Sequence, residues 1–220
     1  CEGGKVLDGR SGGNFERAMQ SGRVPGGQGK TVGVSAPHGQ EASVVVLAGL
    51  GKRDELTDLA IEEAAGAAFH AVKMSGAETL TVDARSFSAE QAARVAFAIK
   101  LAAYRFDKYL TRQKPEKIPS VTGLTVVCAD VKATEAAFQP LSAVADGVIF
   151  ARDMVSEPDN VREHEEFHKR CKAPESLGLE SEVVGEKELG KRGHRTRQEV
   201  GTGSRRDRND ALKKRRGDKA

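Results

Sequence analysis

Residues 148–161 read VIFARDMVSEPDNV, and this stretch decides how the chain is organised. Its first half alternates apolar and charged residues at helical spacing, which predicts the end of a long helix that begins near Thr134. The helix cannot continue, because Pro158 lacks a backbone N–H and disfavours helical geometry at Glu157. The Asp-Asn pair that follows is typical of turns and helix starts. The sequence therefore predicts a joint between two units at this point.

Upstream of the joint, predicted strands and helices alternate, which is typical of an α/β fold. The run 43–47 is continuously apolar, as in a strand covered on both faces. Alanine-rich amphipathic stretches predict the helices, with Asp54 near the start of the first and Ser88 as the cap of the second. The predicted strands are 31–34, 43–47, 79–82 and 124–128, the predicted helices are 55–74, 88–103 and 134–155, and residues 104–119 form a charged, proline-bounded loop.

Two apolar helix faces are predicted from the spacing of apolar residues. Each is expected to lie on one side of its helix. Because the second unit is expected to be incomplete, the end of the second stripe, around Met154 and Val155, is expected to be exposed. The first helix is expected to bury Leu56, Leu59, Ala60, Ala64, Ala67 and Ala68. The long helix before the joint is expected to present one stripe made of Ala145, Val148, Ile149, Met154 and Val155.

Downstream of the joint, a shorter pattern predicts the start of a second unit. It consists of a helix over 163–172, a strand over 179–184 and a helix that opens at 186. Residues 187–220 then contain thirteen Lys/Arg and five Asp/Glu, whereas the whole chain carries a net charge of only +3. Because residues 190–220 hold few apolar side chains, we expect a disordered tail that attracts polyanions weakly.

The composition excludes several classes of protein. The longest uncharged apolar stretch, residues 43–51, is far shorter than the roughly 20 residues that cross a bilayer, so no membrane span is expected. No charged and apolar leader opens the chain, and the three cysteines, Cys1, Cys128 and Cys171, form no disulfide framework. We therefore expect a cytoplasmic protein. Because Cys1 stands where Met would, we also expect that the original start is missing.

The sequence His164-Glu165-Glu166-Phe167-His168 matches the zinc-protease pattern H-E-x-x-H. On a helix, the two histidines would share a face and could bind zinc, with Glu165 as general base. A third ligand is needed, and Glu188 lies at a tolerable distance without the pattern expected around it. The short, charged helix favours coincidence over a zinc site.

Gly29-Lys30-Thr31 ends like a phosphate-binding P-loop, but two features argue against that function. The first glycine of the motif would be residue 24, which is Val24. A phosphate-binding loop follows a strand and opens a helix, whereas this triplet leads into a predicted strand. We therefore interpret it as an ordinary loop.

Four stretches together resemble the leucyl (cytosol) aminopeptidase family. They are LAGLGKR at 47–53, YRFDKY at 104–109 with Lys114-Pro115 after it, ARDMVSEPDNV at 151–161, and the run from Leu177 to Leu189. The third is the most specific, because it is similar to the family's ARDLVN-x-P-x-N almost letter for letter. The resemblance covers about residues 3–191 in the family's order. In relatives, Pro stands where this chain has His164, so that histidine implies no metal.

The resemblance implies the fold and the domain boundaries. It implies a macro-domain-like layered sheet with flanking helices, followed by a linker helix and an incomplete second α/β domain. Residues 1–150 would form the N-terminal α/β domain with its first strand missing. Residues 151–189 would hold the end of the linker helix and the start of the catalytic domain, and residues 190–220 the basic tail. The resemblance therefore implies a truncated chain.

The resemblance also implies the chemistry. The family removes N-terminal amino acids from peptides with two divalent ions, Zn or Mn, in a cytoplasmic homohexamer. The ligands lie in motifs resembling K-G-(I/V)-T-(F/Y)-D-(S/T)-G-G and N-T-D-A-E-G-R-L, and neither occurs in these 220 residues. No catalytic, cofactor-binding or metal-binding residue is therefore assigned, and we expect the chain alone to be inactive and not hexameric.

Several alternatives stay open. A macro-domain-like module could bind a nucleotide, and some bacterial relatives also bind DNA; a zinc protease using His164, Glu165 and His168 is the third hypothesis. The tail from 190 departs from the family's apolar sequence, which resembles a shifted reading frame, although a natural basic extension is the other explanation. The residue preference and the metal of the parent enzyme are not fixed by the sequence.

Overall fold

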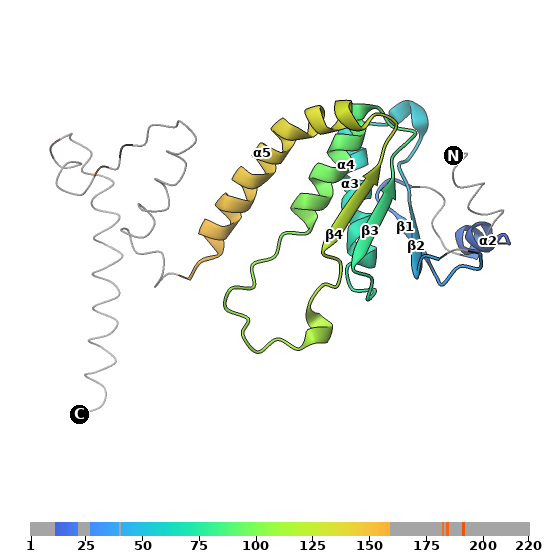
Figure 1. The fold of residues 1–220 in the computed structure, drawn as a ribbon, viewed down its shortest axis with the longest axis horizontal. Coiled ribbons are helices and arrows are strands. Elements are labelled where there is room, and N and C mark those ends of the chain that lie inside the picture. Colours follow the sequence, from blue (N-terminus) through green and yellow to red (C-terminus); the bar gives the residue numbers. More distant parts are fainter. Residues whose placement is uncertain are drawn as a thin grey trace. The chain divides into compact units, whose positions relative to one another are not determined.

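The computed structural model describes residues 12–21, 27–39 and 41–158, together with the single positions Glu182, Val184 and Lys191. The chain divides into two units, Cys1–Ser156 and Glu157–Ala220, and the helices and strands of Figure 1 lie in the first. The predicted helix over 163–172, the following strand and helix, and the basic tail lie outside the described residues apart from those single positions. No helix among the described residues is long and apolar enough to cross a membrane.

Helices and strands alternate along the first unit, which confirms the predicted mixed α/β class (Figure 1). Two short 3-10 turns, Arg53–Glu55 and Pro115–Lys117, interrupt the connections. In chain order the elements are α2 (Asn14–Ser21), β1 (Thr31–Ser35), β2 (Val44–Ala48), α3 (Asp58–Val72), β3 (Thr79–Asp83), α4 (Ala89–Ala102), β4 (Gly123–Val127) and α5 (Val131–Ser156).

The described strands form two separate pairs. β1 and β2 are antiparallel, with Thr31 opposite Ala48, and β3 and β4 are parallel, with Thr79 opposite Gly123. The sequence predicted one layered sheet, but within the described ranges β2 and β3 are not hydrogen bonded to each other. Parallel strands require a crossover element, and α4 provides it between β3 and β4.

The core of the first unit lies between α3 and α4. Leu80 and Val82 of β3 pack against it, because alternate residues of a strand point to the same face. Leu50, which follows β2, packs against the same cluster. Both strand pairs therefore rest on one layer of helices. The buried cluster consists of Ile61, Ala65, Phe69, Val95, Ala98 and Ile99.

The start of α3 differs from the prediction. Thr57, and not Asp54, is the N-cap: its hydroxyl accepts a hydrogen bond from Ala60 N at 3.2 Å, while Asp54 lies in a 3-10 turn. The predicted burial of Leu59 was also wrong, because its side chain is 60% exposed. The helix starts three residues later than predicted, and Ile61 is the large residue of its first turns that faces the core.

The cap of α4 was predicted correctly. The Ser88 hydroxyl accepts a hydrogen bond from Gln91 N at 3.3 Å, and the Gln91 side chain accepts one from Ser88 N at 3.1 Å. This reciprocal capping box satisfies two backbone donors that the first turn of a helix leaves without partners. Ser88 therefore fixes where α4 begins.

Helix α5 starts at Val131, three residues before the predicted start, because Asp130 caps it by accepting a hydrogen bond from Ala133 N at 3.0 Å. It packs along α4, where Lys100 Nζ lies 2.7 Å from Asp146 Oδ1. The exposure expected at the end of the predicted stripe is found at Val155, which is 73% exposed, whereas Ala145 is buried.

Candidate functional site

The structure brings together the two stretches of sequence around Tyr104 and Asp153 at the end of α5. The Tyr104 hydroxyl donates a hydrogen bond to Asp153 Oδ1 at 2.8 Å, across 49 residues of sequence. The guanidinium of Arg152 lies over the Tyr104 ring, with its carbon 5.5 Å from the ring centroid. We name these three residues, Tyr104, Arg152 and Asp153, the clasp. It holds the last turns of α5 against the chain that leaves α4.

Arg152 also binds the end of α4. Its Nη1 donates a hydrogen bond to the carbonyl oxygen of Leu101 at 3.0 Å. The last four carbonyl groups of a helix have no partner within the helix, and they carry a partial negative charge. A guanidinium placed there satisfies one carbonyl and interacts favourably with the helix dipole. The clasp therefore joins the ends of both helices.

The surroundings of Tyr104 keep its hydroxyl protonated. Withdrawal of the phenol from water raises the pKa of Tyr104 above its usual value, and the hydrogen bond to Asp153 raises it further. A hydrogen bond with Ser156 and the charge of Arg152 act in the opposite direction. At neutral pH the side chain is thus a hydrogen-bond donor that holds α5 in place. It is not poised to act as a base or a nucleophile.

The loop that follows Tyr104 is held by contacts of its own. The Arg105 guanidinium contacts the Gln113 side chain and donates a hydrogen bond to the Lys117 carbonyl oxygen at 3.3 Å. Gln113 Nε2 donates to the same carbonyl at 3.0 Å. Phe106 and Tyr109 form a tilted ring pair with centroids 5.9 Å apart. These contacts make the loop an ordered support on which Tyr104 is fixed.

The other candidate chemistry in the sequence is not assembled in the described part of the chain. Thr31 opens strand β1 rather than a helix, as the interpretation of Gly29-Lys30-Thr31 as an ordinary loop predicts. His164, Glu165 and His168 lie outside the described residues. Within the described ranges, no three His, Cys, Asp or Glu side chains gather in a way that could hold a metal ion.

The carboxyl ends of β3 and β4 are where a nucleotide would bind in an open parallel sheet. Asp83, which ends β3, forms an ion pair with Arg85 at 2.7 Å. At each of the two nearby helix starts one backbone donor is already engaged, Gln91 N by Ser88 and Ala133 N by Asp130, and Glu90 accepts a hydrogen bond from the Ser88 hydroxyl at 2.8 Å. These carboxylates disfavour a phosphate group at this edge. Nucleotide binding stays a prediction that no described contact favours.

The clasp can be tested by titrating its phenol. The chain contains two tyrosines and no tryptophan, so Tyr109→Phe leaves Tyr104 as the only phenol in an ultraviolet titration. We expect this phenol to ionise above the usual tyrosine range. Asp153→Ala is expected to lower its pKa, because the carboxylate that accepts the hydrogen bond is removed.

The matched control is Asp146→Ala on the same helix. Asp146 pairs with Lys100 rather than with Tyr104, so its removal should leave the titration unchanged. A titration that is equally unaffected by Asp153→Ala would show that the clasp does not form in solution.

Comparison with known proteins relates this chain to aminopeptidases. Residues 1–113 match the sequence profile of the cytosol aminopeptidase family, N-terminal domain. A probable cytosol aminopeptidase of Caulobacter vibrioides is 46% identical over 194 residues, which are 88% of this chain and 39% of that relative. One from Chelativorans sp. is 39% identical over 166 residues, covering 74% of this chain and 34% of the relative. The chain thus spans about two fifths or less of the length of these relatives.

Two solved structures share the fold. The bottromycin maturation enzyme BotP in complex with Mn superposes with a TM-score of 0.63 and 26% identity, over 81% of this chain and 37% of that one. A tomato leucine aminopeptidase variant gives a TM-score of 0.58 over 71% of this chain and 31% of its own, at 22% identity, and this similarity concerns the fold alone.

Proposed function

The chain belongs to the cytosol aminopeptidase family, and from this membership we propose that its first unit is the non-catalytic N-terminal part of a metallo-aminopeptidase. The observation that carries the proposal is the match of residues 1–113 to the family's N-terminal domain. The identity of 46% with the Caulobacter relative supports it. The proposed reaction of the whole enzyme is release of N-terminal amino acids from peptides.

The chemistry proposed for the whole enzyme is two-metal hydrolysis. A pair of divalent ions, Zn or Mn, would polarise the scissile carbonyl and activate a water molecule. The side chains described here do not fit such a pair, because no three potential ligands gather among them. Asp83 is paired with Arg85, and Asp153 accepts the Tyr104 hydrogen bond. We therefore assign this chain no catalytic step and propose that it is inactive alone.

The clasp is proposed to set the direction in which the chain leaves α5. The boundary between the two units falls between Ser156 and Glu157, directly after the turn that Asp153 and Arg152 hold. A hydrogen bond, a ring contact and a capped carbonyl together restrict the last turn more than any one of them would. The clasp residues are thus positioning residues for the joint.

A chimera tests the proposed function. Residues 1–158 of this chain would replace the aligned residues of the Caulobacter relative, with the parent relative measured in parallel. If the first unit is a genuine N-terminal domain, the chimera should keep metal-dependent release of leucine within about tenfold of the parent, which corresponds to ~1.4 kcal/mol. A folded, soluble chimera without turnover beside an active parent would contradict the proposal.

The remaining features are proposed from family membership. We propose a cytoplasmic location, and a catalytic domain that begins within residues 151–189. A homohexamer is proposed for the whole enzyme and not for this chain. Weak polyanion binding through the basic residues of 190–220 is a separate proposal that rests on their charge.

A further inference from the structure

Helix α5 contains a proline in its interior, where it weakens a helix. Pro140 lies well beyond the first turn of this 26-residue helix. Proline has no N–H to donate to the carbonyl oxygen of Ala136, and its ring pushes that carbonyl aside, so the helix bends at a cost in stability. The ribbon of α5 changes direction in its yellow part (Figure 1). Pro140 thus divides α5 into an upstream segment, 131–139, and a downstream segment, 141–156.

Pro140 stands on the side of α5 that faces away from α4. It is exposed, whereas Ser142 contacts Lys100 and Ala145 is buried. At about 3.6 residues per turn, Ser142 and Ala145 fall on roughly the opposite side of the helix from Pro140. A helix bends away from its proline, because the displaced carbonyl opens the side on which the ring stands. The bend therefore turns the downstream segment toward α4.

In the described part of the chain, the polar contacts from α5 to α4 and to Tyr104 begin directly after Pro140. Lys100 Nζ donates a hydrogen bond to Ser142 Oγ at 2.9 Å and lies 2.7 Å from Asp146 Oδ1. The clasp follows in the last turns of α5, where Tyr104 donates to Asp153 and Arg152 donates to the end of α4. All of these contacts belong to the downstream segment.

We propose that Pro140 is a positioning residue: the bend that it makes in α5 brings the downstream segment onto α4 and so allows the clasp to form. The start of α5 is fixed separately, because Thr134 Oγ1 donates to the Asp130 carbonyl oxygen at 2.7 Å. Arg152 follows Pro140 by about 18 Å of helix, so a change of roughly 20° at the bend would move it by about 6 Å. That displacement is larger than a hydrogen bond is long. The inference does not rest on the proposed function.

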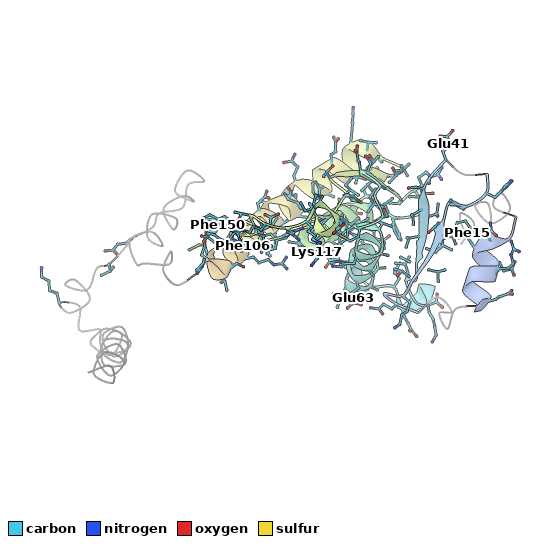
Figure 2. All side chains as sticks on the ribbon, turned by 90° about the horizontal axis from the view of Figure 1, so that it is seen from below. Phe15, Glu41, Glu63, Phe106, Lys117 and Phe150 are labelled. Carbon is cyan, nitrogen blue, oxygen red and sulfur yellow. The ribbon has the colours of Figure 1, made fainter. Side chains whose placement is uncertain are left out.

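Apolar packing at the clasp end of α5 offsets the cost of the proline. Phe150 of the downstream segment and Phe106 of the loop after Tyr104 are both half-buried, and both lie toward this end of the first unit (Figure 2). Aromatic side chains contribute much of the apolar surface that folding removes from water. A bend that seats the downstream segment therefore gains burial as well as polar contacts.

The test is the ultraviolet titration of Tyr104 in the full 220-residue chain carrying Tyr109→Phe, with Pro140→Ala as the variant. Alanine restores the N–H that proline lacks and removes the ring, so α5 is expected to straighten. The downstream segment then moves away from Tyr104. We expect the phenol to ionise at lower pH than in the parent, because withdrawal from water and the hydrogen bond to Asp153 both raise its pKa.

Gly147→Ala is the matched control. Gly147 is exposed on nearly the same side of α5 as Pro140, and a Cβ added to it meets nothing within 4 Å. This change also replaces a poor helix former by alanine, but it leaves the bend in place. The titration of Tyr104 should therefore stay at that of the parent.

Far-ultraviolet circular dichroism measures the helix content of each variant, and Pro140→Ala should retain at least that of the parent. An unchanged Tyr104 titration in Pro140→Ala would overturn the proposal. So would an equal decrease in Gly147→Ala, which would assign the effect to a stiffer helix and not to the bend. A loss of helix content in Pro140→Ala would overturn it as well, because α5 is expected to stay helical when it straightens.

Discussion

Replacing Ile61 by alanine is expected to lower the free energy of unfolding by about 3 kcal/mol, within the range of roughly 2–5 kcal/mol measured for such truncations in cores. Ile61 is 1% exposed and is one of the two largest fully buried side chains among the described residues. It belongs to the cluster that Phe69 and Val95 share between α3 and α4. The lost stability is the sum of two contributions: the transfer free energy of the removed carbon atoms, and the cost of the cavity that they leave behind. Because small domains are stable by only about 5–15 kcal/mol, this change is large.

The control for this prediction is Leu59→Ala, two positions earlier on the same helix. The side chains of Leu59 and Ile61 have the same number of carbon atoms, but Leu59 is 60% exposed. Truncating it should change the free energy of unfolding by no more than about 0.5 kcal/mol. Urea denaturation followed by circular dichroism measures both. Equal losses for the two variants would show that the core is not where α3 and α4 place it.

The second large effect is on activity: the purified chain is expected to release no leucine from leucyl peptides, even with Mn or Zn added. Two-metal hydrolysis needs several carboxylate ligands around two adjacent ions. No three potential metal ligands gather among the described residues, and some of their carboxylates are engaged in structural contacts, as Asp58 and Glu62 are with Arg94 at 2.9 and 2.6 Å. The two ligand motifs that the family resemblance implies do not occur in these 220 residues. We therefore expect no detectable release of leucine by this chain under conditions in which the Caulobacter relative turns over.

Much of the fold could be predicted because its signals are local. Ser88 was identified as a cap since a serine precedes an alanine-rich run by one residue, and the structure confirms it. The start of α3 was missed because both Asp54 and Thr57 are good caps, and only the packing of Ile61 decides between them. The start of α5 was also predicted too late. The first turn, which Asp130 caps, has too few apolar residues to show helical spacing in the sequence.

Strand pairing and the clasp could not be predicted, because both depend on contacts between residues that are distant in the sequence. Periodicity predicts that strands exist but not which strands pair, so the separation of β1–β2 from β3–β4 was not visible in the sequence. The clasp is the clearest example at the candidate site. Tyr104 and Asp153 were both noticed within family-specific stretches, yet their hydrogen bond spans 49 residues. Nothing in local propensity indicates that a loop tyrosine meets the last turn of α5.

The central claim is that this chain supplies the N-terminal part of an aminopeptidase and not its chemistry. Hydrolysis of leucyl-4-nitroanilide by the purified 220-residue chain, with added Mn or Zn and the Caulobacter relative as positive control, tests it most directly. We predict release indistinguishable from buffer for this chain and clear turnover for the relative. Turnover that co-purifies with the chain and disappears with a chelator would show that the chain carries catalytic residues of its own. Its further loss in His164→Ala would place the chemistry in the HEEFH stretch instead.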